Sequence, residues 1–298
     1  MFTIPVLKPN DQVELIAPAS RCSEERLQLT QQMLTSWGLQ CIVNPSLFGS
    51  DLLCANSDFM RSQLLIEALT NPDNKAIICL RGGYGSMRLI PELHKIKQME
   101  FKLFIGMSDI TALNLFFMQK WKWPVLHGGI APDYYTLESL ARYKSYLFGE
   151  INQLEFQGSA LNQHALKNNT ISSTITGGNL CLLQASIGTT WEIDTQNKFV
   201  FIEEVGERGY RIDRMLEHLT QTGIFSKAQG IILGDFTGGN EPDGSSLIQP
   251  VLERFAQAQS IPVFQIKGVG HDSTNFPLPL GIPAHIHLGD TINLTVFR

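Results

Sequence analysis

A serine at the junction of an apolar strand and a helix is the first candidate for chemistry. The apolar run 103–105 ends at Gly106, and Ser108 follows at the start of a predicted helix. Such a turn lifts the hydroxyl out of the chain and directs helix N–H groups toward whatever the hydroxyl attacks. Ile110 stands where the familiar Gly-x-Ser-x-Gly motif has its last glycine. The segment therefore indicates a nucleophilic serine, and an ordinary helix N-cap is the alternative.

A glycine-rich loop at residues 82–85 follows the predicted strand 76–80. The loop lacks the Gly-Lys-Ser/Thr ending of a phosphate-binding loop and the glycine spacing of a dinucleotide fold. Glycines also let a backbone approach a substrate closely and present N–H donors, as an oxyanion hole requires. Because this loop and Ser108 both follow strands of a predicted parallel sheet, we expect them at the same sheet edge. A tight turn without a function is the alternative.

A nucleophilic serine needs a base, and the chain has seven histidines. His94 and His218 fall in predicted helices and His164 in a polar stretch, where surface positions are the simplest interpretation. His285 and His287 share one strand face, but no nearby carboxylate cluster completes a metal site. No metal and no organic cofactor is therefore expected.

The remaining histidines, His127 and His271, both lie in glycine-flanked turns after short apolar runs. The pattern does not choose between them as the base. For the acid, the predicted strand 199–203 carries Glu203 at its end, and Glu204 follows directly. Strand side chains alternate between faces, so only one of these carboxylates can point at a given site. Two solvated acids at the start of a turn are the alternative.

The composition excludes several classes of protein. The 298 residues carry a net charge of −5 and no cluster of Lys or Arg, which argues against a protein that binds nucleic acid. Five scattered cysteines suit free thiols in a reducing compartment. The start of the chain lacks the pattern of a signal peptide, and no run is long enough to span a membrane. We therefore expect a cytoplasmic protein.

The elements that must position these residues alternate between strands and helices in the first half. Strands are predicted at 13–17, 39–43, 76–80 and 103–105, with helices at 23–37, 58–69 and 86–93 and after Ser108. This alternation predicts a parallel sheet covered on both faces. A stretch rich in Asn and Gln between residues 157 and 170 predicts a linker. We therefore expect an N-terminal domain at 1–150, a linker at 151–172 and a C-terminal domain at 173–298.

Taken together, these segments resemble the LD-carboxypeptidase family of serine peptidases, the muramoyltetrapeptide carboxypeptidases. The resemblance runs nearly from end to end, and its motifs occur in the family's order. The matching segments are residues 15–20, 81–86, 106–112, 177–180, 203–204 with 210–216, and 270–271 ahead of 278–281. Glu204 departs from the pattern, since many relatives carry Asp there.

The resemblance implies a role for each candidate residue. Ser108 would be the nucleophile, His271 the general base and Glu203 the acid that orients it. Gly83 and Asp109 would contribute backbone N–H groups to the oxyanion hole. The family has a flavodoxin-like parallel-sheet N-terminal domain and a smaller mixed α/β C-terminal domain that resembles a swivelling β-barrel. The site would then lie between a domain that carries the serine and one that carries acid and base.

The resemblance also implies a substrate and a setting. The family removes D-alanine from cytoplasmic murein tetrapeptides during cell-wall recycling, and relatives are commonly homodimers. A related branch hydrolyses microcin-type peptidyl nucleotides, and Trp191 is an aromatic side chain that can stack on a base. The compact chain favours the wall-recycling branch. A third interpretation is a non-catalytic module that binds peptides in the same cleft, which would have no need of Ser108, Glu203 and His271 together.

Overall fold

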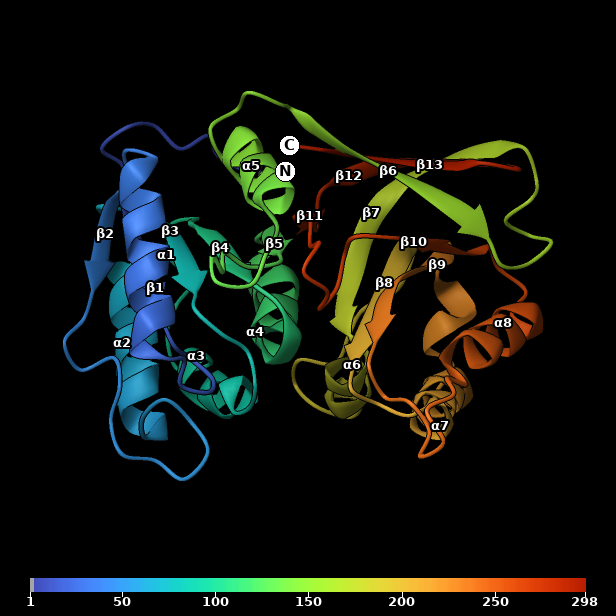
Figure 1. Cartoon of the computed structure of the whole chain (residues 1–298), viewed down its shortest axis with the longest axis horizontal. Helices are drawn as coiled ribbons and strands as arrows, with labels where there is room; N and C mark the ends of the chain where they lie inside the picture. Colours follow the sequence, from blue (N-terminus) through green and yellow to red (C-terminus); the bar gives the residue numbers. More distant parts are fainter. Residues whose placement is uncertain (1–2) are drawn as a thin grey trace.

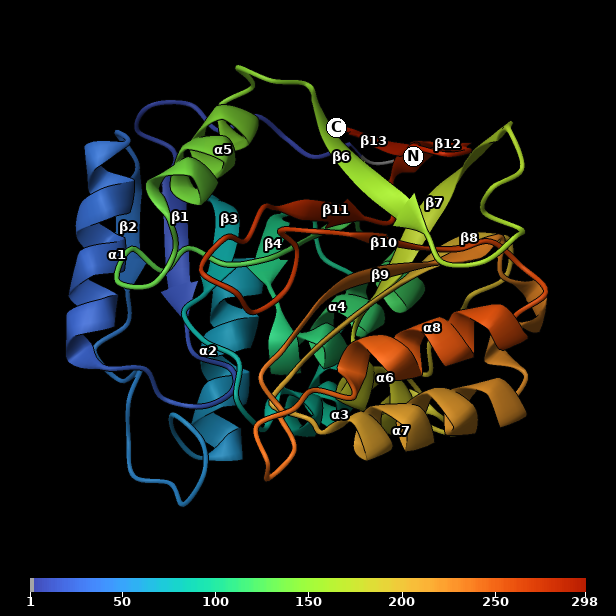
Figure 2. The same ribbon diagram turned by 45° about the vertical axis from the view of Figure 1, so that its right-hand side comes forward.

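The computed structural model describes residues 3–298. Its first part is a parallel sheet with helices packed on both faces, and Figure 2 shows α1 on the opposite side of the sheet from α2 and α4. The strands here are β1 (Gln12–Ile16), β2 (Gln40–Val43), β3 (Asn74–Cys79), β4 (Leu103–Gly106) and β5 (Val125–His127). The helices are α1 (Glu24–Ser36), α2 (Asp58–Thr70), α3 (Ile90–Leu93), α4 (Thr111–Phe116) and α5 (Leu137–Leu147). Short turns η1 (Ser86–Leu89), η2 (Ser108–Ile110) and η3 (Phe117–Trp121) flank them.

Local sequence signals account for these elements. The Ser23 hydroxyl accepts a hydrogen bond from the Arg26 N–H (3.1 Å) and caps the start of α1. Gly38, with φ of +87°, allows the left-handed turn that follows this helix. Ala76, Ile77 and Ile78 in β3 are all buried, as in a sheet covered on both faces. The predicted parallel α/β architecture is therefore confirmed.

The second part is a closed barrel of mixed strand direction, with α6, α7 and α8 gathered on one side of it (Figure 1). The strand order is β10-β6-β13-β12-β7-β8-β9. The strands are β6 (Gln153–Ala160), β7 (Asn169–Asn179), β8 (Lys198–Val205), β9 (Gly230–Thr237), β10 (Val263–Ile266), β12 (Pro283–Leu288) and β13 (Ile292–Phe297). The helices are α6 (Leu180–Ser186), α7 (Gly209–Gln221) and α8 (Ile248–Ala258), with the turn η4 (Ile224–Lys227). No helix in residues 3–298 is long and apolar enough to cross a membrane.

The segment 151–172, which we expected to link two domains, instead contributes strands to the barrel. Residues 153–160 form β6, and β7 begins at Asn169. Leu154 and Phe156 are buried, whereas their neighbours at 153, 155 and 157 along the strand are exposed. A half-exposed strand carries polar residues at every second position, so its composition alone resembles that of a linker.

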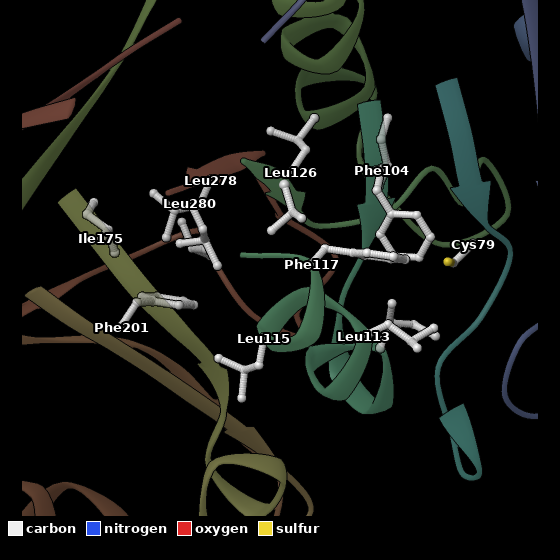
Figure 3. Packing of buried hydrophobic residues seen from close by; sticks show 14 of the residues in the cluster. Cys79, Phe104, Leu113, Leu115, Phe117, Leu126, Ile175, Phe201, Leu278 and Leu280 are labelled. Carbon is white, nitrogen blue, oxygen red and sulfur yellow. The ribbon is translucent and has the colours of Figure 1, made fainter. Parts of the chain in front are cut away.

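Strand β11 (Leu278–Leu280) returns from the barrel part of the chain to the sheet. The sheet order is β11-β5-β4-β3-β1-β2, and β11 is antiparallel to β5. Figure 3 shows Leu278 and Leu280 between Leu126 of β5 and Ile175 of β7, so buried side chains of sheet and barrel form one continuous core. Strand β11 therefore contacts both the sheet and the barrel.

A second junction between the two parts joins β7 to the start of α4. Gly178, with φ of +143°, passes so close to this helix that a Cβ there would lie 2.5 Å from the Thr111 Oγ1. The next residue, Asn179, donates its backbone N–H to the same Oγ1 (3.0 Å). Thr111 comes three residues after Ser108, so this contact sets the barrel directly against the helix that begins at the serine.

The guanidinium of Arg61 is buried and ties together the loops that precede the site. It donates to the carbonyls of Pro18 and Gly85 and pairs with the Asp58 carboxylate (2.6 Å). Pro18 follows β1 and Gly85 belongs to the glycine loop, and within residues 3–298 Arg61 is the side chain that donates to both carbonyls.

We predict that Arg61→Met lowers the free energy of unfolding by about 3 kcal/mol, because buried carbonyls lose a charged donor. Urea unfolding followed by circular dichroism measures the change. Arg88→Met is the matched control, since Arg88 pairs with the same Asp58 from a half-exposed position. The control should lose less than about 1 kcal/mol. Equal losses in the two variants would contradict a structural role for Arg61 in this loop junction.

Candidate active site

Ser108 sits in a sharp turn between β4 and the helical segment that leads into α4. Its φ is +64°, in the left-handed region that residues other than glycine seldom adopt. Gly106 makes the turn possible, because a Cβ there would lie 2.5 Å from the Ile110 side chain. Backbone strain of this kind is typical of a serine held for reaction at a strand-to-helix turn. Ser108 thus lies at a strand-to-helix turn, where the sequence predicts it.

The glycine loop packs directly on this turn. A Cβ at Gly82 would lie 3.0 Å from the Ser108 Oγ and 3.1 Å from the Asp109 nitrogen. Only a glycine permits this approach, and it brings the loop to the first N–H groups of the helix. Gly83 has φ of +100°, and a Cβ there would collide with the Ser20 side chain. The sequence pattern points to Gly83, whereas the steric role of Gly82 is visible only in the structure.

Two hydrogen bonds lock the loop to the turn. The Ser86 N–H donates to the Asp109 Oδ2 (2.8 Å), and the Ser86 hydroxyl donates to the Asp109 carbonyl (2.6 Å). Both residues are buried. The Asp109 carboxylate thus holds the glycine loop in place, and the backbone N–H of Asp109 faces that loop.

Glu203 and His271 form a short, partly buried hydrogen bond. The Nδ1 of His271 lies 2.6 Å from the Glu203 Oε2, at the end of β8. Glu203 is fully buried, and its Oε1 has no hydrogen-bond partner among residues 3–298. Burial acts to lower the pKa of His271, but the charge of Glu203 and this hydrogen bond together raise the pKa above its ordinary value. The pair therefore favours the imidazolium form.

Glu204 points the opposite way and has a different role. Its carboxylate accepts hydrogen bonds from the Asn179 side chain (3.0 Å) and from the backbone N–H groups of Val205 (2.8 Å) and Cys181 (2.9 Å). The Cys181 bond places the carboxylate at the N-terminus of α6. The expected division of the two acids between strand faces is confirmed, and the alternative of two solvated acids is wrong because both are buried.

The loop that carries His271 is held by the sheet. The Tyr134 hydroxyl donates to the His271 carbonyl (2.9 Å), and the Thr136 N–H donates to the Ser273 carbonyl (2.9 Å). Farther along, the Asn275 N–H donates to the Ser139 hydroxyl (2.9 Å). These partners lie on the segment from β5 to α5, so the histidine loop of the barrel part is also anchored to the sheet part.

Asp235, near the end of β9, packs against the other side of this loop. A Cβ at Gly270 would lie 2.8 Å from the Asp235 Cβ. Burial raises the pKa of Asp235 to about 6, against the opposing effect of backbone N–H donors at Gly268 and Val269. The sequence analysis missed Asp235, because nothing in the pattern of β9 shows that these N–H groups come from the histidine loop.

His127, the alternative base, lies in the core. It is fully buried, its ring packs edge-on against Phe201 with centroids 5.2 Å apart, and burial lowers its pKa to about 4. It does not line the cavity that contains Ser108. A buried imidazole of such low basicity is poorly suited to accept a serine proton.

The other histidines lie apart from Ser108. His94 bonds Thr190 (2.8 Å), and His287 bonds Thr170 (3.0 Å). Within residues 3–298 there is no group of three or more His, Cys, Asp or Glu side chains placed to hold a metal ion.

A cavity of about 270 Å³ opens at Ser108. Gly82, Gly83 and His271 line it together with the serine, and Glu203 lies behind the histidine. A hydroxyl, an imidazole backed by a carboxylate and backbone N–H donors are the groups that acyl transfer requires. The cavity walls also include side chains that the sequence analysis did not assign, namely Arg26, Arg81, Tyr134 and Tyr135. A larger cavity of about 510 Å³, lined by Trp123 and Ile175, contains none of the predicted site residues.

Comparisons with known proteins identify the family of the chain. The model of the LD-carboxypeptidase N-terminal domain matches residues 13–128, and that of the LD-carboxypeptidase C-terminal domain matches residues 172–286. The chain is 30% identical to the probable murein peptide carboxypeptidase of Bacillus subtilis, over 95% of this chain and 91% of the relative. It is 28% identical to the murein tetrapeptide carboxypeptidase of Pseudomonas aeruginosa, over 90% and 91% of the two chains.

Solved structures show the same fold. The muramoyltetrapeptide carboxypeptidase of Oxalobacter formigenes superposes with a TM-score of 0.81 at 26% identity, covering 96% of this chain and 99% of the other. The microcin C7 self-immunity protein has a TM-score of 0.84, but its 18% identity shows a likeness of fold alone; the match covers 100% of this chain and 99% of that one. With both family models matched in order over most of its length, the chain belongs to the LD-carboxypeptidase family of peptidases.

Proposed function

We propose that this protein is a serine carboxypeptidase that hydrolyses the L,D-amide bond releasing terminal D-alanine from murein tetrapeptides. The observation that carries the proposal is the hydrogen bond between His271 and the buried Glu203, with His271 and the strained Ser108 lining one cavity. The names of the relatives from Bacillus subtilis and Pseudomonas aeruginosa supply the substrate class. We place the reaction in the cytoplasm, in cell-wall recycling, and expect the protein to act as a homodimer.

In the proposed reaction, the Ser108 Oγ attacks the carbonyl carbon of the scissile amide, and His271 Nε2 takes the hydroxyl proton. Glu203 holds the imidazole through Nδ1 and stabilises its charged form. The N–H groups of Gly83 and Asp109 stabilise the negative oxygen of the tetrahedral intermediate. His271 then gives the proton to the nitrogen of D-alanine as the C–N bond breaks. D-alanine departs, and the rest of the peptide stays on Ser108 as an ester, the acyl-enzyme. Water, deprotonated by His271, hydrolyses this ester and restores Ser108.

The peptidyl-nucleotide alternative draws support from the fold of the microcin C7 self-immunity protein, one structure of which holds aspartyl sulfamoyl adenosine. The aromatic residue that the sequence analysis considered for stacking, Trp191, is only 4% exposed. Its carbonyl accepts a hydrogen bond from Gln119, and the residue does not line the cavity at Ser108. Since base stacking requires an open ring face, this tryptophan lends the alternative no support.

The nucleophile is tested by Ser108→Ala, which should reduce turnover by roughly four to six powers of ten. Mass spectrometry of L-Ala-γ-D-Glu-meso-diaminopimelyl-D-Ala after incubation measures the loss of D-alanine. Ser36→Ala is the control, since this exposed hydroxyl bonds only the carbonyl of Met33 in its own helix. Near-normal release of D-alanine by Ser108→Ala would show that Ser108 is not the nucleophile.

The base is tested by the same substitution at the two candidate histidines. His271→Gln should lose about three or more powers of ten in turnover, because no group remains to accept the serine proton. His127→Gln should keep activity within about tenfold of the wild type, since a base with so low a pKa contributes little at neutral pH. The D-alanine assay is run well below the melting temperature of each variant. Comparable losses at both positions would refute the choice of His271.

The pH dependence of kcat/KM reports the charge state of His271. Because its pKa is raised above the ordinary value of 6.5, the neutral base is lost as the pH falls through that raised pKa, and activity falls with it. Glu203→Gln removes the charge that raises the pKa, so the acidic limb should move to lower pH while the plateau drops. A pH–rate profile of both proteins measures this. An acidic limb that stays in place would show that Glu203 does not set the pKa of the base.

A further inference from the structure

The cavity at Ser108 has two arginines in its wall, Arg26 and Arg81. Arg26 is already paired with a carboxylate. Its Nε lies 3.0 and 2.9 Å from the two carboxylate oxygens of Asp133, and its Nη2 lies 2.9 Å from one of them. This two-pronged ion pair satisfies the guanidinium and neutralises its charge. Arg26 therefore offers little to a further anion unless Asp133 moves away.

Arg81 differs because its charge is not neutralised. Its Nη1 donates to the backbone carbonyl of Arg21 (2.9 Å), an acceptor with no net charge. Among residues 3–298 no carboxylate lies within ion-pair distance of this guanidinium, and the residue is exposed. The bond to Arg21 fixes one edge of the planar group, and its other N–H donors remain available. Arg81 is thus a cation held at the edge of the cavity, with no carboxylate of residues 3–298 to neutralise it.

The backbone places Arg81 beside the reacting atoms. It directly precedes Gly82, where a Cβ would lie 3.0 Å from the Ser108 Oγ. In a peptide cut at its last amide bond, only one α-carbon separates the scissile nitrogen from the terminal carboxylate. The anion that distinguishes a chain end from a chain interior must therefore lie close to the nucleophile. Arg81 directly precedes the glycine that packs on Ser108, so its guanidinium is suitably placed to bind this terminal carboxylate.

We propose that Arg81 binds the free C-terminal carboxylate of the substrate and so restricts the site to removal of a terminal residue. The inference rests on the proposed function and adds the group that recognises the leaving amino acid. A guanidinium matches a carboxylate through paired N–H···O bonds, which a lysine cannot reproduce. The small cavity of about 270 Å³ agrees with a leaving group as compact as alanine.

The test compares two tetrapeptides that differ only at the C-terminus, one ending in D-alanine and one in D-alaninamide. The wild type should cleave the free acid with the higher kcat/KM. Arg81→Met should lower kcat/KM for the acid by about 10- to 100-fold, mainly through KM, because a hydrogen-bonded charge contact is lost. The amide should change by less than about threefold, since it carries no charge for Arg81 to bind. The preference for the acid then disappears.

Two variants sharpen the test. Arg81→Lys keeps the charge without the paired geometry and should recover only part of the preference. Arg26→Met is the matched control in the same cavity and should leave the acid-to-amide ratio unchanged. An equal loss on both peptides in Arg81→Met, or loss of the preference in Arg26→Met instead, would overturn the assignment of Arg81 alone. Failure of the wild type to cleave either peptide would contradict the proposed function itself, and the inference with it.

Discussion

The pairing of β11 with β5 is the constraint on which the site depends. Leu278 pairs with His127 and Leu280 with Val125, so a segment from the barrel part of the chain becomes the edge strand of the sheet. The loop just before β11 carries His271. Because β11 pairs with β5, this loop lies close to the turn at Ser108, and both residues line one cavity. The Tyr134 hydroxyl and the Thr136 N–H then donate hydrogen bonds to this loop, and the Ser139 hydroxyl accepts one from it. Without the β11–β5 pairing, Ser108 would belong to the sheet part of the molecule and His271 to the barrel part alone.

Burial of charge is the second theme of the site. Glu203 and Glu204 are adjacent and both buried, which is costly unless each carboxylate has partners. Strand alternation separates them: Glu203 bonds His271, and Glu204 accepts a hydrogen bond from the backbone N–H of Cys181 at the start of α6. The same arrangement serves structure and chemistry, because the Glu203 charge that raises the pKa of His271 is buried, where its field is weakly screened.

Close backbone approach is the third theme, and glycines permit it at each junction. Gly82 touches Ser108, Gly106 allows the turn before it, and Gly178 lets β7 rest on Thr111. A side chain at any of these positions would push apart the elements that meet at the serine. These glycines lie in the motifs that carry the family resemblance, and the contacts give a steric reason for them. The oxyanion hole proposed at Gly83 and Asp109 depends on the same approach.

Local patterns in the sequence were sufficient for strands β1 to β4, for helices α1 and α2, for the turn at Ser108 and for the division of Glu203 and Glu204 between strand faces, but they did not predict β5 or α5. These features depend on period, caps and φ, which neighbouring residues determine. The choice of His271 over His127 came from family resemblance, since both occupy similar turns. Only the tertiary structure decided that 153–160 is a barrel strand, that β11 joins the sheet, that His127 is buried, and that Asp133 neutralises Arg26 but not Arg81. Each of these depends on contacts between residues far apart in sequence, whose pairing is set by the burial and closure of the whole chain rather than by any local pattern.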